Sequence, residues 1–422
     1  MARTPTNFFT SERRAVLEDL TGQLSDTDLL ILHTIGQYSA TKLWPMEVYK
    51  AINDPDNGRD TTRPLTADNG HVAFRNAIKP LIDPEQIGFR GCFLPEEAGC
   101  AGVAVPVYMM GLEMIAQGNA SVALSLLIDG SILNSIWKLG DEKQKERYVR
   151  DALRDKKMTA FAQTEPGHGS DAGNLETRAI LDGNHYVLNG QKSWNTNGGW
   201  ADYYFVIVRT HPDRMRGPNG LSIIMVHRDE ISDIRQIQKY SVPGSYNAEL
   251  FFNDARVPVE EDNVKRMIGE KDRGFASTKE LLTGGRVTVA AYGLGIATEA
   301  FEDALDYSRE RVSQGEPLFE KQAIRLPLGE CKAQIDAARL STYSAAKRMQ
   351  EGRLGAEASE AKLLANDIAL RMALFNMSVH GAYGTAKEYR AHQLFDDVWG
   401  GFVGEGTAEV QKILIAHAIR HS

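Results

Sequence analysis

The sequence predicts a multidomain α+β protein with an N-terminal α-helical bundle, a middle β-barrel-like domain and a C-terminal four-helix bundle. Two changes in hydrophobic period lead to this prediction. Apolar residues recur at helical spacing up to residue 157, alternate with period two over residues 158–270, and return to helical spacing over residues 271–422. Short strands between two helical regions favour a β-barrel or sandwich. We therefore expect three domains, bounded by these ranges.

The first 80 residues show the least pattern. Residues 26–38 (DTDLLILHTIGQY) predict a helix with Asp26 as its cap. Residues 53–69 are rich in Asp, Arg, Thr and Pro, and such a composition predicts a loop or an insertion.

Two apolar helices are expected next in the chain. Apolar residues at helical spacing predict a helix over residues 106–117, and Asn119 can cap a second helix over residues 122–139. The second segment has so many apolar positions that it must be buried on more than one face. Residues 141–156 are polar and charged, which predicts a solvated helix leading out of the bundle.

The middle region reads as strands. Residues 182–185 predict a hairpin turn between strands over 177–181 and 185–189. Three further strands are expected, over residues 203–210, 221–226 and 248–252.

The last region reads as helices. Three long helices are expected over residues 275–310, 319–351 and 356–381, followed by a short fourth over residues 388–399. A final helix over residues 407–420 has Thr407 as a plausible cap and Glu409 in its first turn.

The composition limits the possible functions. The net charge of −8 disfavours a nucleic-acid-binding surface. Three cysteines fit neither a disulfide framework nor a zinc pattern, and no metal site is expected. The N-terminus lacks an apolar signal segment, and no uncharged run reaches the length of a membrane span. We therefore expect a soluble cytoplasmic protein with buried or incidental thiols.

Four motifs stand in order along the chain. They are Thr164-Glu-Pro-Gly-His-Gly-Ser-Asp171, Asn189-Gly-Gln-Lys-Ser-Trp-Asn-Thr-Asn-Gly-Gly199, Asn253-Asp-Ala-Arg-Val-Pro258 and Gly404-Glu-Gly-Thr-Ala-Glu-Val-Gln411. Each is weak alone, and the first could be a plain interdomain turn. Together, from about residue 91 onward, the chain resembles the acyl-CoA dehydrogenase family in the order and spacing of these motifs.

The resemblance implies FAD as cofactor. It places Trp194 against the isoalloxazine ring, for which a flat apolar face is suitable. It implies that Thr164 and Thr196 hydrogen-bond to the ring, Thr196 near flavin N5, and that Phe161 and Gln163 line the same edge. The remaining residues implied to contact FAD are Gly169, Ser170, Arg311, Gln322, Gly381, Gly384, Thr407 and Glu409.

Several of these residues come from the last domain, so the resemblance implies that the FAD site is completed across a dimer within a homo-oligomer, with a tetramer expected. A surface position at a helix end is the commoner fate of an arginine such as Arg311. His168 has no assigned role, and we expect it on the solvent side of its turn.

Glu405 is the expected catalytic base. Removing the α-proton of a thioester requires a base on one face while flavin N5 accepts the β-hydride on the other, and burial raises a carboxyl pKa toward neutrality. In another branch of the family the base stands where this chain has Gly285, which leaves Glu405 alone. The resemblance further implies substrate contacts from Ser170, Thr283, Arg286 and Gly406.

The expected reaction is FAD-dependent α,β-dehydrogenation of an acyl-CoA to a 2-enoyl-CoA, with electron-transferring flavoprotein as acceptor. Two alternatives stay open. One is a flavin oxidase or monooxygenase on the same fold. The other is a non-catalytic DNA-binding relative, which the lack of a basic C-terminal extension disfavours. The chain departs from the family at Gly404, where an aromatic residue is common, and this departure predicts an unusual acyl group.

Overall fold

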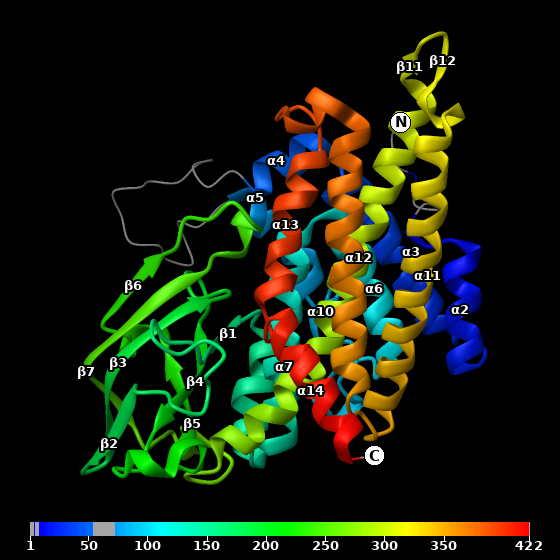
Figure 1. Cartoon of the computed structure of the whole chain (residues 1–422). Helices are drawn as coiled ribbons and strands as arrows, with labels where there is room; N and C mark the ends of the chain where they lie inside the picture. Colours follow the sequence, from blue (N-terminus) through cyan, green and yellow to red (C-terminus); the bar gives the residue numbers. More distant parts are fainter. Residues whose placement is uncertain (1–3, 5–7, 54–71, 422) are drawn as a thin grey trace.

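The computed structural model describes residues 4, 8–53 and 72–421. Its elements follow the predicted order of helices, strands and helices (Figure 1). The loop expected over residues 53–69 lies almost wholly outside the described residues. Among the N-terminal helices are α2 (Ser11–Thr21), α3 (Asp26–Tyr38), α4 (Met46–Asn53) and α5 (Val72–Ile82).

Helix α3 has the predicted bounds but a different cap. Ser25, rather than Asp26, is the N-cap, because its hydroxyl accepts the backbone N–H of Asp28 at 3.1 Å while the Asp28 carboxylate accepts the N–H of Ser25. This reciprocal arrangement is a capping box with Asp at its third position. The helix expected over residues 141–156 is divided into α8 (Glu142–Lys145), a π-helical turn and α9 (Asp151–Arg154).

The two apolar helices are confirmed as α6 (Val105–Gly118) and α7 (Ala120–Leu139). Asn119 caps α7 by accepting the N–H of Val122 at 3.2 Å. Helix α7 is long and apolar enough to cross a membrane by length and composition alone, but most of its apolar stretch is buried inside the protein. It is therefore a core helix of this fold, with other helices and the β-domain packed around it.

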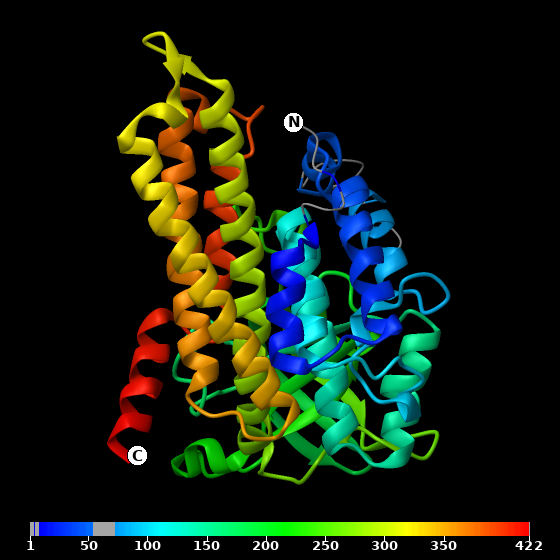
Figure 2. The same cartoon turned by 90° about the vertical axis from the view of Figure 1, so that its right-hand side faces the viewer.

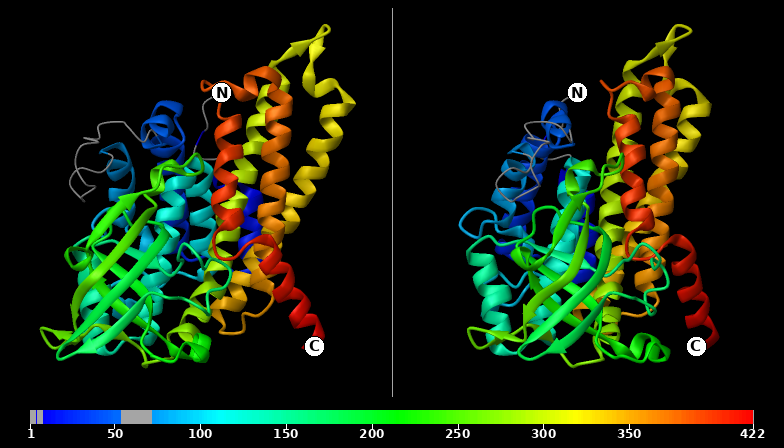
Figure 3. Two further views of the ribbon diagram at one scale, coloured as in Figure 1. Left: turned by 60° about the vertical axis from the view of Figure 1, so that its left-hand side comes forward. Right: turned by 90° about the vertical axis from the view of Figure 1, so that its left-hand side faces the viewer.

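The middle region is one curved eight-stranded sheet (Figure 3). The predicted hairpin is confirmed as β2 (Arg178–Asp182) paired with β3 (His185–Asn195). Strand β4 (Tyr203–Arg209) lies between β5 (Leu221–His227) and β2, and β1 (Thr159–Ala162) runs parallel to β4. The other strands of this sheet are β6 (Asp233–Gln236), β7 (Ala248–Pro258) and β10 (Met267–Ile268). Strands β8 (Glu260–Glu261) and β9 (Val264–Lys265) pair with each other as a separate small hairpin.

Both faces of the sheet are apolar, which explains the near-continuous hydrophobic run in β4. Tyr204, Val206 and Val208 face a core inside the curved sheet, whereas Phe205 and Ile207 face the helices. The two ends of the sheet, β10 and β6, do not pair within the described residues, so the barrel-like sheet is not closed by hydrogen bonds.

The C-terminal bundle consists of α10 (Gly274–Glu310), α11 (Gln322–Gln350), α12 (Glu357–His380) and α13 (Ala391–Val403). Helix α10 lies at its centre and packs against α6 and α7 as well as against the other bundle helices (Figure 2). A small hairpin of β11 (Val312–Ser313) and β12 (Glu316–Pro317) joins α10 to α11. Helix α14 (Ala408–His421) packs against α12 and projects from the opposite end of the bundle (Figure 1).

Candidate active site

Glu405 occupies a sharp turn between α13 and α14. Helix α13 ends at Val403 with Gly404 as its C-cap. Glu405 then adopts φ +54° and Gly406 φ +90° before α14 begins. A left-handed backbone is uncommon for a residue with a side chain, and it persists only where its surroundings enforce it.

Two side chains hold the turn from outside it. The Gln411 side chain, on α14, donates through Nε2 to the carbonyl oxygens of Glu405 at 3.1 Å and Gly406 at 2.9 Å. Lys362, which is 2% exposed on α12, donates through Nζ to the Gly406 oxygen. Neither residue was anticipated from the sequence. Lys362 was detectable in principle, because it stands on the buried alanine-rich face of α12 with Ala358, Ala361 and Ala365.

Helix α10 leaves room for the Glu405 side chain at Gly285. A Cβ atom added there would lie 2.9 Å from both Cδ and Oε2 of Glu405. A side chain at position 285 would therefore collide with the Glu405 carboxylate. Because Gly285 has no side chain, the Glu405 carboxyl group occupies the space beside it.

Burial raises the pKa of Glu405 to about 7, against smaller opposing effects from Arg286 and Lys362. Its Oε2 atom is buried and has no hydrogen-bond partner in the described part of the chain. Burial likewise lowers the pKa of Lys362 to about 8. A carboxyl group with a pKa near neutrality is matched to proton abstraction at physiological pH.

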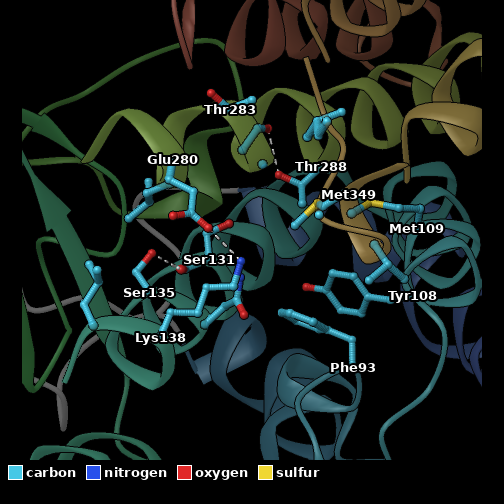
Figure 4. A pocket seen from close by; sticks show the side chains of 18 of the residues that line it. Phe93, Tyr108, Met109, Ser131, Ser135, Lys138, Glu280, Thr283, Thr288 and Met349 are labelled. Atoms are coloured by element: carbon cyan, nitrogen blue, oxygen red, sulfur yellow. Dashed lines mark hydrogen bonds and ion pairs between the residues drawn. The ribbon is translucent and has the colours of Figure 1, made fainter. Parts of the chain in front are cut away.

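A cavity of about 200 Å³ lies against Gly285 (Figure 4). Its walls come from α6, α7, α10, the end of α11 with the segment that follows it, and the segment before α6. Phe93, Tyr108, Met109 and Met349 form an aromatic and thioether region (Figure 4). Thr283 also lines this cavity.

The first motif docks on the strand that carries Trp194. Within it, Glu165 pairs with buried Lys192 at 2.7 Å and accepts the backbone N–H of Thr177 at 2.9 Å. The Thr164 oxygen accepts the N–H of Ser193 at 2.8 Å. Burial lowers the pKa of Lys192 to about 8, although Glu165 opposes this effect. This buried ion pair brings Thr164 beside Trp194, a role that the sequence analysis did not assign to either charged residue.

Trp194 is presented to solvent rather than packed in a core. Its side chain is 58% exposed and its φ is +61°, at an irregularity in the pairing of β3 with β7. Asn247 donates through Nδ2 to the Trp194 oxygen at 2.9 Å and to Thr196 Oγ1 at 3.4 Å. A large aromatic ring exposed in this way offers a flat apolar surface on which a ligand ring can stack.

Gln163 directly precedes Thr164 in the loop after β1, and its Oε1 atom is buried without a partner among the described residues. Phe161 is half-buried and packs toward Phe205 at 6.1 Å between ring centroids. Gly169 and Ser170 are exposed at the tip of the loop. The His168 side chain is 20% exposed, with its Nδ1 atom buried at 3.5 Å from Asp171.

A second group of expected FAD residues lies at the other end of the bundle. Arg311 caps the C-terminus of α10, Gln322 begins α11, and Gly381 and Gly384 follow α12. Along α10, the 25 residues from Arg286 to Arg311 span about 37 Å. Within one chain these residues are therefore remote from the Glu405 turn (Figure 1).

Thr407 and Glu409 are on the near side, at the start of α14. Thr407 accepts the N–H of Val410 at 3.5 Å, and the Glu409 pKa is lowered by its own backbone and by Thr407. Within the C-terminal bundle, the expected residues form two sets. Arg286, Glu405, Gly406 and Thr407 lie around the Glu405 turn, and Arg311, Gln322, Gly381 and Gly384 lie at the other end. The remaining residues, Phe161, Gln163, Thr164, Trp194 and Thr196, lie on the middle domain.

Comparison with known protein families covers most of the chain. Residues 69–156 match the acyl-CoA dehydrogenase N-terminal domain, residues 160–255 the middle domain, and residues 272–420 the C-terminal domain.

Individual relatives agree with this result. The chain is 35% identical over 373 residues to the short-chain-specific acyl-CoA dehydrogenase of Megasphaera elsdenii, covering 86% of this chain and 95% of that protein. The butyryl-CoA dehydrogenase structure from the same organism superposes with a TM-score of 0.84 at 32% identity, over 94% of this chain and 99% of the other.

A further structure, described as the electron transferring flavoprotein of Acidaminococcus fermentans, also contains a similar chain. It gives a TM-score of 0.84 at 28% identity over 95% of this chain and 99% of that one. On the family matches and the identity to its curated relative, the chain belongs to the acyl-CoA dehydrogenase family of FAD-dependent oxidoreductases.

Proposed function

We propose that this protein dehydrogenates a short acyl-CoA to its 2-enoyl-CoA, with Glu405 as the base that removes the α-proton. The observation that carries the proposal is the buried Glu405 carboxyl group, held in a left-handed turn against the cavity residue Gly285 with its pKa raised to about 7. Short-chain and butyryl-CoA relatives support the size of the substrate.

The residues fit a flavin. The exposed ring of Trp194 offers a stacking surface, and the orphaned Gln163 Oε1 atom is an acceptor for the N–H groups that such a ring carries. Thr196 Oγ1 accepts a hydrogen bond from Asn247, which leaves its own hydrogen to donate to the ring. When bound, FAD supplies the hydride acceptor of the reaction.

The protein performs the proton chemistry. Glu405 is buried enough to be a strong base once ionised, and Arg286 and Lys362 stabilise that ionised form. The backbone N–H of Glu405 donates no hydrogen bond to the described residues, so it is available to the thioester carbonyl. A donor aimed at this oxygen stabilises the enolate-like transition state that proton removal creates.

The Arg311 set belongs, in this proposal, to the FAD site of a second copy of the chain. Helix α10 separates Arg286 from Arg311 by about 37 Å, so the Arg311 residues of one chain lie far from the Glu405 turn of the same chain. A homo-oligomer, with a tetramer as the expected form, brings the two sets together. Electron-transferring flavoprotein is the proposed acceptor, and the similarity to a chain in the Acidaminococcus structure supports it. We place the reaction in the cytoplasm.

The test is anaerobic mixing of the purified flavoprotein with butyryl-CoA. We expect loss of the visible absorption band of oxidised flavin and formation of crotonyl-CoA. Addition of oxygen should restore the band slowly, whereas an oxidase would restore it within the turnover time. Purified protein that binds no flavin, or a flavin band unchanged by every acyl-CoA tested, would reject the proposal.

A further inference from the structure

The cavity beside Gly285 contains a feature that a plain alkyl chain does not explain. The hydroxyl group of Tyr108 points into the cavity (Figure 4). Tyr108 is only 1% exposed, and its hydroxyl has no hydrogen-bond partner in the described residues. Leaving a buried hydroxyl unpaired costs about 1–3 kcal/mol, so such a group calls for a partner.

The position of this hydroxyl is fixed by its surroundings. The Tyr108 ring stacks on Phe89 at 4.8 Å and contacts Phe93 at 4.4 Å between ring centroids. A Cβ atom at Gly130, on α7, would lie 2.9 Å from the hydroxyl oxygen. The two aromatic neighbours therefore restrict movement of the Tyr108 ring, and a ligand would reach the hydroxyl from the cavity side.

The other hydroxyl groups in the cavity wall donate to helix carbonyl oxygens. Ser131 donates to Leu127 at 2.7 Å, and Ser135 donates to Ser131 at 2.9 Å. Thr283 donates to Lys279 at 2.8 Å, and Ser277 donates to Arg273 at 3.5 Å. Thr288 donates to the Gly285 oxygen at 2.8 Å. Tyr108 is thus the hydroxyl among these with a free hydrogen, and an acceptor on the ligand would pair with it.

We propose that the preferred acyl group is short and carries a neutral oxygen acceptor at its far end, to which the Tyr108 hydroxyl donates. This inference deepens the proposed function and depends on it. The chemical class is a keto- or ether-bearing acyl thioester. Tyr108 is then the residue that determines specificity.

The charge of the surroundings favours a neutral oxygen over a carboxylate. The one cation in the cavity wall, Lys138, is half-exposed and pairs with Glu280 at 2.9 Å. A second carboxylate would have to lose its hydration near Phe93, Met109 and Met349, where no free cation compensates within the described residues. Burial keeps Tyr108 protonated, since it raises the pKa of this phenol well above its ordinary value.

The cavity, of about 200 Å³, favours a short acyl group. A 5-oxohexanoyl group places six non-hydrogen atoms beyond the thioester carbonyl, and 5-methylhexanoyl replaces its ketone oxygen by a methyl group of similar size. These two thioesters form a matched pair that differs in one acceptor.

The experiment measures kcat/KM for 5-oxohexanoyl-CoA, 5-methylhexanoyl-CoA and adipoyl-CoA with the wild-type holoenzyme and with Tyr108→Phe. We expect the wild type to prefer the keto substrate over its methyl analogue by about tenfold, as one hydrogen bond to a buried donor allows. In Tyr108→Phe this preference should vanish, because the variant has no hydroxyl to donate to the ketone oxygen. Tyr240→Phe, at a position 90% exposed, is the matched control and should behave as wild type.

Butyryl-CoA distinguishes a failure of the proposed dehydrogenation from a failure of the inference about Tyr108. If butyryl-CoA fails to reduce the flavin, the proposed function is wrong. If butyryl-CoA is oxidised but the keto and methyl substrates react equally, or adipoyl-CoA reacts best, the inference about Tyr108 is overturned while the function stands. Thermal melting and FAD content of Tyr108→Phe show whether the variant folds. Should it not fold, the wild-type preference among the three thioesters still decides.

Discussion

At the scale of single residues, the site depends on one side chain held in an unfavourable backbone conformation. Glu405 has φ +54°, and its carboxyl group fills the space left by Gly285. Gln411 and Lys362 hold the two carbonyl groups of the turn. These contacts keep a desolvated carboxyl group next to the cavity, where solvent would otherwise stabilise its charge.

Replacing Glu405 by Gln keeps the shape of the side chain and removes the base. We expect Glu405→Gln to bind FAD normally and to lose exchange of the substrate α-proton with solvent deuterium, with turnover reduced by about 10²–10⁴-fold. Mass spectrometry of recovered substrate measures this exchange. Exchange at the wild-type rate would show that another group is the base.

The same substitution should change how stability depends on pH. The folded-state pKa of Glu405, about 7, lies above its ordinary value of 4.5. Its contribution to stability is therefore fully present below the ordinary value and is lost as pH rises through 7. Urea unfolding of the wild type should show this loss between pH 5 and pH 8, relative to Glu405→Gln. Parallel curves for the two proteins would contradict the raised pKa.

Lys362 is expected to set the pH range of activity. Its charge lowers the pKa of Glu405, so Lys362→Met should raise that pKa and move the acidic limb of the kcat/KM profile upward from about pH 7. Lys143→Met, at an exposed position, is the control. A limb that stays in place in Lys362→Met would restrict Lys362 to its hydrogen bond with Gly406.

At the scale of elements, a glycine lets helix α13 pack closely against α10 and α12 and thereby positions the turn that carries Glu405. A Cβ atom at Gly401 would lie 2.4 Å from Asn366 Oδ1 and 2.8 Å from the Tyr292 ring. The last turns of α13 can therefore approach α10 and α12 closely. This contact fixes where the turn after α13 emerges.

Gly401→Ala tests that contact. We expect overpacking to destabilise the fold by about 1–3 kcal/mol and to displace the Glu405 turn, with a larger loss in kcat than in FAD content. Gly329→Ala, on the exposed face of α11 where an added Cβ would meet nothing within 4 Å, should be neutral or slightly stabilising. Chemical denaturation and steady-state kinetics measure the two effects.

At the scale of the whole molecule, the two sets of expected FAD residues lie at opposite ends of the C-terminal bundle (Figure 1). In the proposed oligomer, one chain supplies Trp194 and Glu405 and another supplies Arg311. The two sets are far apart because α10, with 37 residues, is a long, continuous helix that runs from one end of the bundle to the other.

Mixed oligomers test this arrangement. Arg311→Ala and Glu405→Gln should each be inactive alone, yet their co-expressed mixture should recover part of the activity because some sites draw both intact residues from different chains. Size-exclusion chromatography with light scattering checks that mixed oligomers form. No recovery in a verified mixed oligomer would place both residues in the site of a single chain.

The sequence by itself determined the order of elements and most of their bounds, because hydrophobic period and caps are local properties. The helix over residues 26–38 and the cap at Asn119 are examples that the structure confirms. The short strand β6 and the π-helical break after α8 were missed, because neither has a local signal strong enough to outweigh its neighbours.

The motifs of the sequence also pointed to Glu405, Trp194 and Thr164, but they were silent on what holds these residues in place. Lys362 on α12, Lys192 paired with Glu165, and Asn247 beneath Trp194 act through contacts between distant segments. The unpaired Tyr108 hydroxyl is of the same kind, since a lack of partners can be seen only when all neighbours are placed. Local pattern decided which chemistry the chain carries, and tertiary packing decided how buried, how charged and how accessible each group is, because desolvation depends on every segment that surrounds it.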